Sequence, residues 1–303
     1  MYSFIIVTWN NIDTIEKCLD SIEKYVSNSE IADIIVVDNG STDGTREFLR
    51  LQKNKKIVSI EAETNLGFAK ANNFGARRAQ GDYLVLMNPD AMLIENGLNM
   101  LTKNLQGDVL LVGPQLVDEK NEYQPSMYMF DSPLNIICEQ FRLGKLLPNR
   151  VKRIIAPYEL KKPCDLKPNW IIGAFYVMRK KDYFKVNGFS EDFFMYSEDM
   201  DICYKIKKNN GTICFYSKYK VQHLGGVSEQ NDMNFTKTEK MFRSRLHFAK
   251  KYKLKANQTV FMKCYEIKKI IFSLLGLFKN MNNNIKKYNN VLKVLKGLKY
   301  EVK

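Results

Sequence analysis

The stretch that decides the fold is Tyr83-Leu84-Val85-Leu86-Met87-Asn88-Pro89-Asp90. Its first five residues form a short apolar run, which is typical of a strand buried on both faces of a sheet. Asn88 and Asp90 follow directly where that strand ends. Because ligands of open α/β sheets bind beyond the carboxyl ends of strands, these two side chains mark the position of a metal or phosphate site.

Strand and helix patterns alternate on either side of this stretch. Strand patterns are predicted at 3–9, 34–37, 57–60 and 83–87, with helical spacing between them, and further strands at 170–178 and 213–216 follow a proline-interrupted segment, 121–168. We expect that segment to be a loop-rich insert. The alternation predicts an α/β fold with a mostly parallel, mixed sheet flanked by helices.

Charge divides the 303-residue chain unevenly. The net charge is +14, but residues 236–303 hold 18 Lys/Arg against 3 acids, whereas residues 1–235 hold 29 against 30. We therefore predict a catalytic domain at 1–235, with a nucleotide-binding half (1–120) and an acceptor-binding half (121–235), and a basic helical region at 236–303. The six cysteines form no C-x-x-C pair, which favours reduced thiols in the cytoplasm.

The basic region has several candidate partners: nucleic acid, anionic lipid or an acidic polymer. Its longest apolar run, Ile270–Phe278, is shorter than the ~20 residues that span a bilayer. Residues Val291–Leu298 predict a basic amphipathic helix, which is typical of a membrane surface. We interpret the region as a peripheral contact with the inner face of the cell membrane. The alternative is that Val260–Leu298 packs on the body or on a second subunit.

Two strand ends carry candidate ligand-binding side chains. Asp38 precedes a glycine-rich turn, so it could accept the imide N–H of uracil or thymine, or it could only cap the next helix. Asn88 and Asp90 could hold Mg²⁺ or Mn²⁺, which prefer oxygen ligands and often bind through carboxylates and substrate phosphates. The alternative for this pair is a simple Asn-Pro-Asp turn.

A second acidic site lies about a hundred residues further on. Glu198, Asp199 and Asp201 follow an aromatic cluster, and crowding with burial could raise one carboxyl pKa enough to make a base near neutral pH. The alternative is a solvated helix N-terminus. His223 ends a predicted strand before Gly225, so it could be a ligand or a structural residue.

Seven motifs follow one another in the chain: Val7–Asn10, Val37–Gly44, Asn65–Ala69 with Asn72, Asn88–Asp90, Trp170 with Gly173 and Ala174, Ser197–Asp201, and His223 with Gly225 and Gly226. Their order resembles that of the inverting glycosyltransferases of family 2, which have the GT-A fold, and most of all the bacterial rhamnosyltransferase-type members. The resemblance covers about residues 2–252. The family's Asp-x-Asp is Asn-Pro-Asp here, and Ser197 stands where many relatives have Thr.

The resemblance implies a role for each motif. Asp199 would be the catalytic base, and Asp90 and His223 would bind Mg²⁺ or Mn²⁺. The acceptor would contact Glu198, Trp170, Gly173 and Ala174. The nucleotide sugar would contact Thr8, Asn10, Asp38, Asn65, Gly67, Asn88 and Arg243.

The sequence thus predicts an inverting glycosyltransferase of cell-surface polysaccharide synthesis. The donor would be dTDP-rhamnose or a UDP-hexose, and the acceptor a glycan or lipid-linked glycan. A sugar-phosphate nucleotidyltransferase is one alternative, but no glycine-rich N-terminal loop with basic residues is present to hold a triphosphate. A nucleic-acid-binding protein would explain only the basic region, so we expect no nucleic-acid partner. Whether the protein forms an oligomer is left open.

Overall fold

The computed structural model describes residues 1–225 and 234–276. The chain forms two compact units. The first combines Met1–Met129 with Pro157–Gln230, and the second combines Phe130–Ala156 with Asn231–Lys303. The second unit includes residues 130–156, which lie in the predicted acceptor-binding half.

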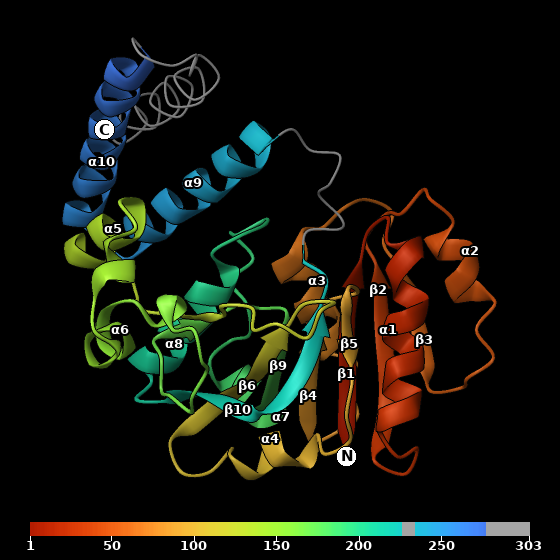
Figure 1. Ribbon diagram of the computed structural model, residues 1–303. Helices are drawn as coiled ribbons and strands as arrows, with labels where there is room; N and C mark the ends of the chain where they lie inside the picture. The colour runs from red at the N-terminus through yellow and green to blue at the C-terminus, as the bar shows by residue number, and fades with distance from the viewer. Residues whose placement is uncertain (226–233, 277–303) are drawn as a thin grey trace. The chain divides into compact units, whose positions relative to one another are not determined.

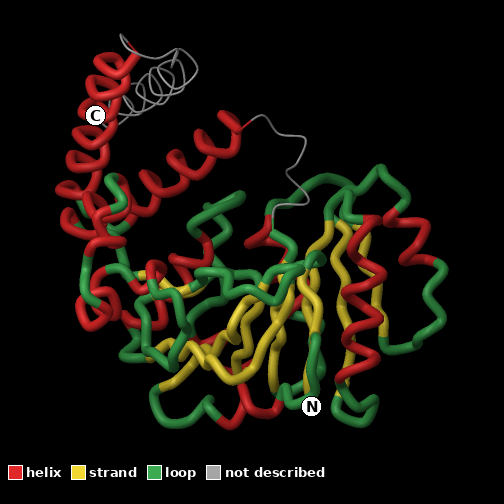
Figure 2. Tube along the Cα trace, viewed as in Figure 1, coloured by secondary structure: helices red, strands yellow, loops and turns green. Residues whose placement is uncertain are grey.

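An eight-stranded mixed sheet forms the centre of the first unit, in the order β3-β2-β1-β4-β9-β6-β10-β5 (Figures 1 and 2). Strands β1 to β4 run parallel, β9 is antiparallel to both of its neighbours, and β10 is parallel to β6. The predicted α/β fold is confirmed. The strands are β1 (Tyr2–Thr8), β2 (Ile31–Asp38), β3 (Ile57–Glu61), β4 (Tyr83–Met87), β5 (Ala91–Leu93), β6 (Val109–Val117), β9 (Phe175–Arg179) and β10 (Thr212–His223).

Helices cover the sheet, and apolar spacing explains how they pack. Helix α1 buries Ile15, Leu19 and Ile22 in the same core as β1, whose seven residues are all buried. The spacing of these three side chains puts them on one helical face. The helices of this unit are α1 (Ile12–Tyr25), α2 (Thr45–Arg50), α3 (Phe68–Ala76), α4 (Asn99–Lys103), α7 (Lys180–Lys185) and α8 (Glu198–Lys208), with the 3₁₀ turn η2 (Pro157–Glu159).

Two predicted elements differ from those observed. The strand expected at 170–178 is interrupted at Gly173: β8 (Trp170–Ile171) pairs with β7 (Met127–Tyr128) in a small second sheet, and β9 then joins the large one. The proline-interrupted segment is partly helical rather than a loop-rich insert. Pro133 begins a helix and Pro148 precedes one, and both positions tolerate proline because the first helical N–H groups have no intrahelical partner.

The second unit is helical. Its elements are α5 (Pro133–Gln140), η1 (Leu143–Leu146), α6 (Asn149–Ile155), α9 (Asn234–Lys251) and α10 (Lys255–Gly276). Phe261, Cys264 and Tyr265 of α10 form a small core with Ile136 and Phe242. The alternative that Val260–Leu298 packs on the body or on a second subunit stays a prediction, because residues 277–298 lie outside the described residues. Within 1–225 and 234–276, none of the helices has both the length and the apolar character needed to cross a membrane. The predicted helix at Val291–Leu298 and the end of the run at Phe278 lie outside the described residues.

Candidate active site

The parallel strands bring the predicted nucleotide-binding residues to one edge of the sheet. Thr8 and Asp38 are register partners at the ends of β1 and β2, and Asn88 follows the end of β4. The backbone N–H of Asn39 donates to the Thr8 carbonyl at 2.8 Å, so the two strands stay joined beyond their ends.

Asp38 fixes the turn after β2 and does not cap the next helix, because Gly44 is the N-cap of α2. Asp38 is fully buried, and its Oδ1 accepts hydrogen bonds from the backbone N–H groups of Gly40 and Ser41 and from Arg46 Nε at 2.7 Å. Its Oδ2 is also buried but has no hydrogen-bond partner among the described residues. One oxygen therefore fixes the turn, while the other remains able to accept a hydrogen bond from a ligand.

The turns after β1 and β3 fix the backbone around this edge. Asn10 has a positive φ of 55°, and its Oδ1 accepts a hydrogen bond from the Thr42 backbone. Asn65 Oδ1 accepts hydrogen bonds from Asn39 Nδ2 and from the Gly67 N–H, both at 2.9 Å. The polar side chains of these turns thus bind each other and the backbone at this edge of the sheet.

Gly67 joins this edge to the segment that precedes the acidic motif. Its φ is +81°, and a Cβ there would lie 2.7 Å from the carbonyl oxygen of Phe194. The Phe68 N–H donates to the same carbonyl at 2.9 Å. A side chain at position 67 would therefore force the two loops apart.

Asp90 and His223 lie beside each other, as a shared metal site requires. Asp90 Oδ1 is 3.4 Å from His223 Nε2, and both side chains are largely buried. Antiparallel pairing of β10 with β5 produces this approach, because His223 is the register partner of Ala91. No group of three or more His, Cys, Asp or Glu side chains in the described part of the chain could hold a metal. An ion at this pair would need further ligands from a bound diphosphate and water.

Gln124 fixes the orientation of the His223 ring and was not predicted from the sequence. Its Oε1 lies 2.8 Å from His223 Nδ1, and its Nε2 donates to the His223 carbonyl at 3.4 Å. With the amide oxygen as the acceptor, His223 Nδ1 is the donor of this hydrogen bond, and Nε2 is the ring atom that faces Asp90. A single Gln in a segment without periodicity carries no signal that sequence patterns could have detected.

Asn88 lies close to this pair but has a different environment. Its backbone N–H donates to the Ala174 carbonyl at 2.9 Å, which ties the end of β4 to the turn before β9. Its buried Oδ1 has no hydrogen-bond partner within the described residues. The amide oxygen can therefore still accept a hydrogen bond from a ligand.

The acidic motif begins α8, and it is not a solvated helix terminus. Glu198 is largely buried and Asp201 fully so, while Asp199 is partly exposed. Burial raises the pKa of both Glu198 and Asp199, and the charge of Asp199 raises the pKa of Glu198 further. Glu198 Oε2 has no hydrogen-bond partner among the described residues.

Gly173 positions Asp199. Asp199 Oδ2 accepts a hydrogen bond from the Gly173 N–H at 3.4 Å, and its Oδ1 accepts one from Met200 N–H at 2.7 Å. A Cβ on residue 173 would lie 3.3 Å from the Asp199 Cβ, so a larger residue would crowd the carboxyl group. The interruption between β8 and β9 therefore includes the residue whose backbone N–H binds the Asp199 carboxyl group.

Trp170, two residues before Ile172, has its ring in a stack of aromatic side chains. Its ring stacks on Tyr128 with centroids 4.4 Å apart, and Tyr128 stacks on Tyr158 at 5.5 Å. The Trp170 indole N–H donates to the Met129 carbonyl at 3.0 Å. Sequence patterns identified only Trp170, because its two partners come from distant parts of the chain.

Arg243 lies on α9 of the second unit and is exposed. Its predicted contact with a diphosphate stays a prediction.

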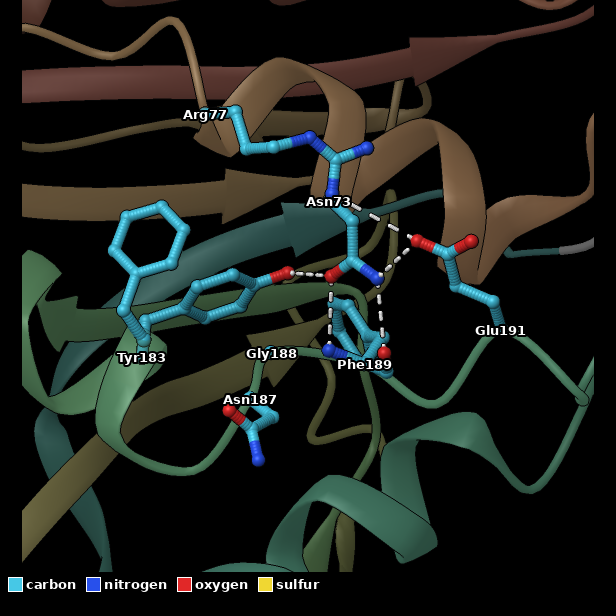
Figure 3. A pocket seen from close by; sticks show the side chains of 8 residues that line it. Asn73, Arg77, Tyr183, Asn187, Gly188, Phe189 and Glu191 are labelled. Atoms are coloured by element: carbon cyan, nitrogen blue, oxygen red, sulfur yellow. Dashed lines mark hydrogen bonds and ion pairs between the residues drawn. The ribbon is translucent and has the colours of Figure 1, made fainter.

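A pocket near α3 and α7 includes none of the predicted site residues (Figure 3). Asn73 in its wall accepts hydrogen bonds from the Tyr183 hydroxyl and the Phe189 N–H, and donates to the Phe189 carbonyl and to Glu191. All of the hydrogen-bonding groups of the Asn73 side chain that the figure draws are thus used within the protein. We interpret the hydrogen bonds in the wall of this pocket as the contacts that hold the segment before α8 against α3.

The sheet order and the acidic residues at its strand ends define an α/β enzyme with the GT-A fold. The chain belongs to glycosyl transferase family 2, whose sequence profile matches residues 3–204.

Two relatives share limited sequence identity with this chain. The chain is 22% identical over 205 residues to poly-beta-1,6-N-acetyl-D-glucosamine synthase of Staphylococcus aureus, covering 67% of this chain and 45% of the synthase. It is also 22% identical over 229 residues to N-acetylglucosaminyl-diphospho-decaprenol L-rhamnosyltransferase of Mycobacterium tuberculosis, covering 70% of this chain and 74% of that enzyme. The chain thus spans less than half of the staphylococcal relative.

Solved structures share the fold. The mannosyltransferase PcManGT from Pyrobaculum calidifontis, in complex with GDP-Man and Mn²⁺, has a TM-score of 0.58 at 16% identity over 100% of this chain and 88% of its own. S. aureus TarS in complex with UDP has a TM-score of 0.51 at 16% identity over 98% and 91%. At this identity the likeness establishes the GT-A fold alone.

Proposed function

We propose that the protein transfers a sugar from a nucleotide sugar to a glycan acceptor with inversion. The proposal depends on the observed environment of Asp199. Two backbone N–H groups bind its carboxyl group, and burial raises the pKa of that group. An acceptor hydroxyl attacks the anomeric carbon while Asp199 takes the hydroxyl proton. The new glycosidic C–O bond forms as the bond between the anomeric carbon and the phosphate oxygen breaks, and the nucleoside diphosphate departs.

Asp90 and His223 are the residues we propose to hold Mg²⁺ or Mn²⁺. The donor set fits, because it combines one carboxyl oxygen with one imidazole nitrogen, and the other nitrogen of that ring donates to Gln124. The bound ion would neutralise charge on the departing diphosphate. The Mn²⁺ in the complex of the Pyrobaculum mannosyltransferase supports this proposal.

Asp38 and Asn88 are the residues we propose to bind the nucleotide. The unpartnered Asp38 Oδ2 suits the imide N–H of uracil or thymine, so it fits both dTDP-rhamnose and a UDP-hexose. UDP in the TarS complex and the rhamnosyl transfer named for the mycobacterial relative support these donors. Trp170, Gly173 and Ala174 would border the acceptor, because Gly173 contacts Asp199. The acceptor class we propose is a glycan or lipid-linked glycan of cell-surface polysaccharide synthesis, in line with the names of both relatives.

A screen of nucleotide sugars tests the proposal. The full chain is heated with each of dTDP-rhamnose, UDP-hexoses and GDP-mannose, with Mn²⁺ or with excess chelator, and the unfolding midpoint is measured. A true donor at 100 times its dissociation constant adds about 2.7 kcal/mol to stability. We expect one uridine or thymidine donor to raise the midpoint strongly, and only with the metal. If no nucleotide sugar shifts the midpoint, the proposed donor site is wrong; if the shift is the same in chelator, the proposed metal site is wrong.

A further inference from the structure

Helix α10 has two apolar faces, and among the described residues only one of them is buried in the core of its unit. Phe261, Cys264 and Tyr265 are buried in the small helical core. A second stripe consists of Ile267, Ile270, Ile271 and Leu274, which are 45%, 60%, 41% and 57% exposed. Their spacing of three, four and seven residues places them on one side of the helix. The end of α10 therefore presents an apolar stripe to the surroundings of the unit.

Exposed apolar side chains are concentrated in this unit as a whole. Soluble proteins scatter them singly, so their accumulation in one part of a chain indicates an interaction surface. The second unit supplies about a quarter of the described residues but ten of the seventeen large apolar side chains that are exposed in the described chain. The ten are Leu134, Ile137, Leu143, Leu146, Ile154, Met241, Ile267, Ile270, Ile271 and Leu274.

The charge of the same unit identifies the class of partner. Residues 130–156 and 234–276 contain 16 Lys/Arg and 4 acids, a net charge of +12. Asp131 and Glu139 are two of these four acids, and both form ion pairs of 2.5 Å with Arg245. Their charge is thus used within the unit and does not offset the other basic residues. The surface of the unit is therefore strongly basic as well as apolar.

We propose that the exposed stripe of α10 lies on an anionic phospholipid surface, with the basic residues of the second unit against the headgroups. An apolar helix face next to basic side chains is the combination that binds in the plane of such an interface. Two copies of this unit carry the same large positive charge and repel each other, which disfavours pairing of the stripe with itself.

The test uses point substitutions in the full chain. Truncation before Phe261 would remove three of the five residues of the helical core, so a truncated protein could lose binding by unfolding. The variant Ile270→Ser with Leu274→Ser removes two exposed apolar side chains and keeps the charge. The matched control is Leu51→Ser with Val58→Ser, two exposed apolar residues of the first unit.

Binding is measured by cosedimentation with vesicles of phosphatidylglycerol and phosphatidylcholine, and with vesicles of phosphatidylcholine alone. We expect wild type and control to bind the anionic vesicles and to lose binding as salt rises, because salt screens the attraction. The Ile270/Leu274 variant should bind at least about tenfold more weakly. Failure of the wild type to bind would overturn the proposal, as would binding that the variant retains.

Two further measurements complete the test. Light scattering of the wild type should give a monomer; a dimer that the Ile270/Leu274 substitutions dissociate would show that a second copy covers the stripe, and would overturn the proposal. Nucleotide-sugar stabilisation of the same variant should equal that of the wild type. Loss of vesicle binding with intact donor binding therefore reports on the lipid surface alone, independently of the proposed transfer reaction.

Discussion

The two units use their carboxyl groups in opposite ways. Glu198 of the first unit is buried, whereas the Glu139 side chain of the second is 35% exposed, and the loss of water contact by itself raises the pKa of each. The charge and hydrogen bonds of Arg245 more than offset that effect at Glu139 and hold its pKa below the usual range, whereas the neighbouring Asp199 raises the pKa of Glu198 further. An acid with a guanidinium partner becomes a structural link, and a buried acid beside a second acid can exchange a proton near neutral pH.

Replacement of Asp199 should have the largest effect. Asp199→Asn keeps the shape of the side chain but removes the base, so transfer should fall by ~10²–10⁴-fold while the affinity for nucleotide diphosphate changes little. Steady-state rates and calorimetric titration measure the two quantities. Transfer within tenfold of wild type would show that another group takes the proton.

Glu198→Gln is the companion test, and the pH profile separates the two acids. A base must be deprotonated, so the transfer rate should rise with pH through the pKa of Asp199, above the usual ~3.9 of an aspartate. Because the folded-state pKa of Glu198 is raised, its contribution to stability declines as pH rises from its unfolded pKa through the folded one. Glu198→Gln should therefore stabilise the protein at alkaline pH more than at pH 4. An equal effect at both would mean that Glu198 does not titrate as described.

Removal of Gln124 should have the next largest effect, on metal affinity. Gln124→Ala frees the His223 ring to rotate, and loss of such an outer contact typically weakens metal binding by ~10–100-fold. Paramagnetic resonance of free Mn²⁺, titrated in the presence of nucleoside diphosphate, measures this affinity without any turnover. Gln124→Glu is the matched control, because a carboxylate oxygen can still accept the Nδ1 proton and should retain most of the affinity. Equal losses in both variants would indicate a general packing defect instead.

Local sequence patterns predicted the first unit better than the second. Asp38 and Asp90 were singled out from local patterns, since each follows the end of a predicted strand, and the family resemblance singled out Asp199 among three neighbouring acids; the roles of all three remain predictions. Gln124 and Arg245 were not predicted, because their partners lie 99 and at least 106 residues away and no short pattern links them. The helices within 121–168 were missed for a different reason: prolines were interpreted as breaks, although Pro133 starts a helix.

Replacement of Arg245 tests the structural side of the comparison. Arg245→Met keeps the length and much of the apolar contact with the Phe261 ring but leaves Asp131 and Glu139 without their cation. Breaking a fully buried pair costs about 3–5 kcal/mol, and we expect about 2 kcal/mol here because the Arg245 side chain keeps some contact with water. Hydrogen exchange should report the loss in the helices of the second unit, with nucleotide binding retained. Faster exchange confined to the large sheet would contradict this assignment.

Asp201 should show the smallest effect, although it lies in the same acidic motif as Asp199. It is fully buried, and its Oδ2 accepts a hydrogen bond from the Ser190 hydroxyl at 2.6 Å, so it holds the loop before α8 rather than facing a ligand. Asp201→Asn can still accept that hydrogen bond and should cost about 1 kcal/mol of stability. Transfer should stay within about tenfold of wild type, well short of the loss that a catalytic acid or base gives. Denaturant unfolding and steady-state kinetics on the same preparation measure both. A 100-fold loss of transfer with unchanged stability would place Asp201 among the catalytic residues and break the distinction between structural and reactive acids within the first unit.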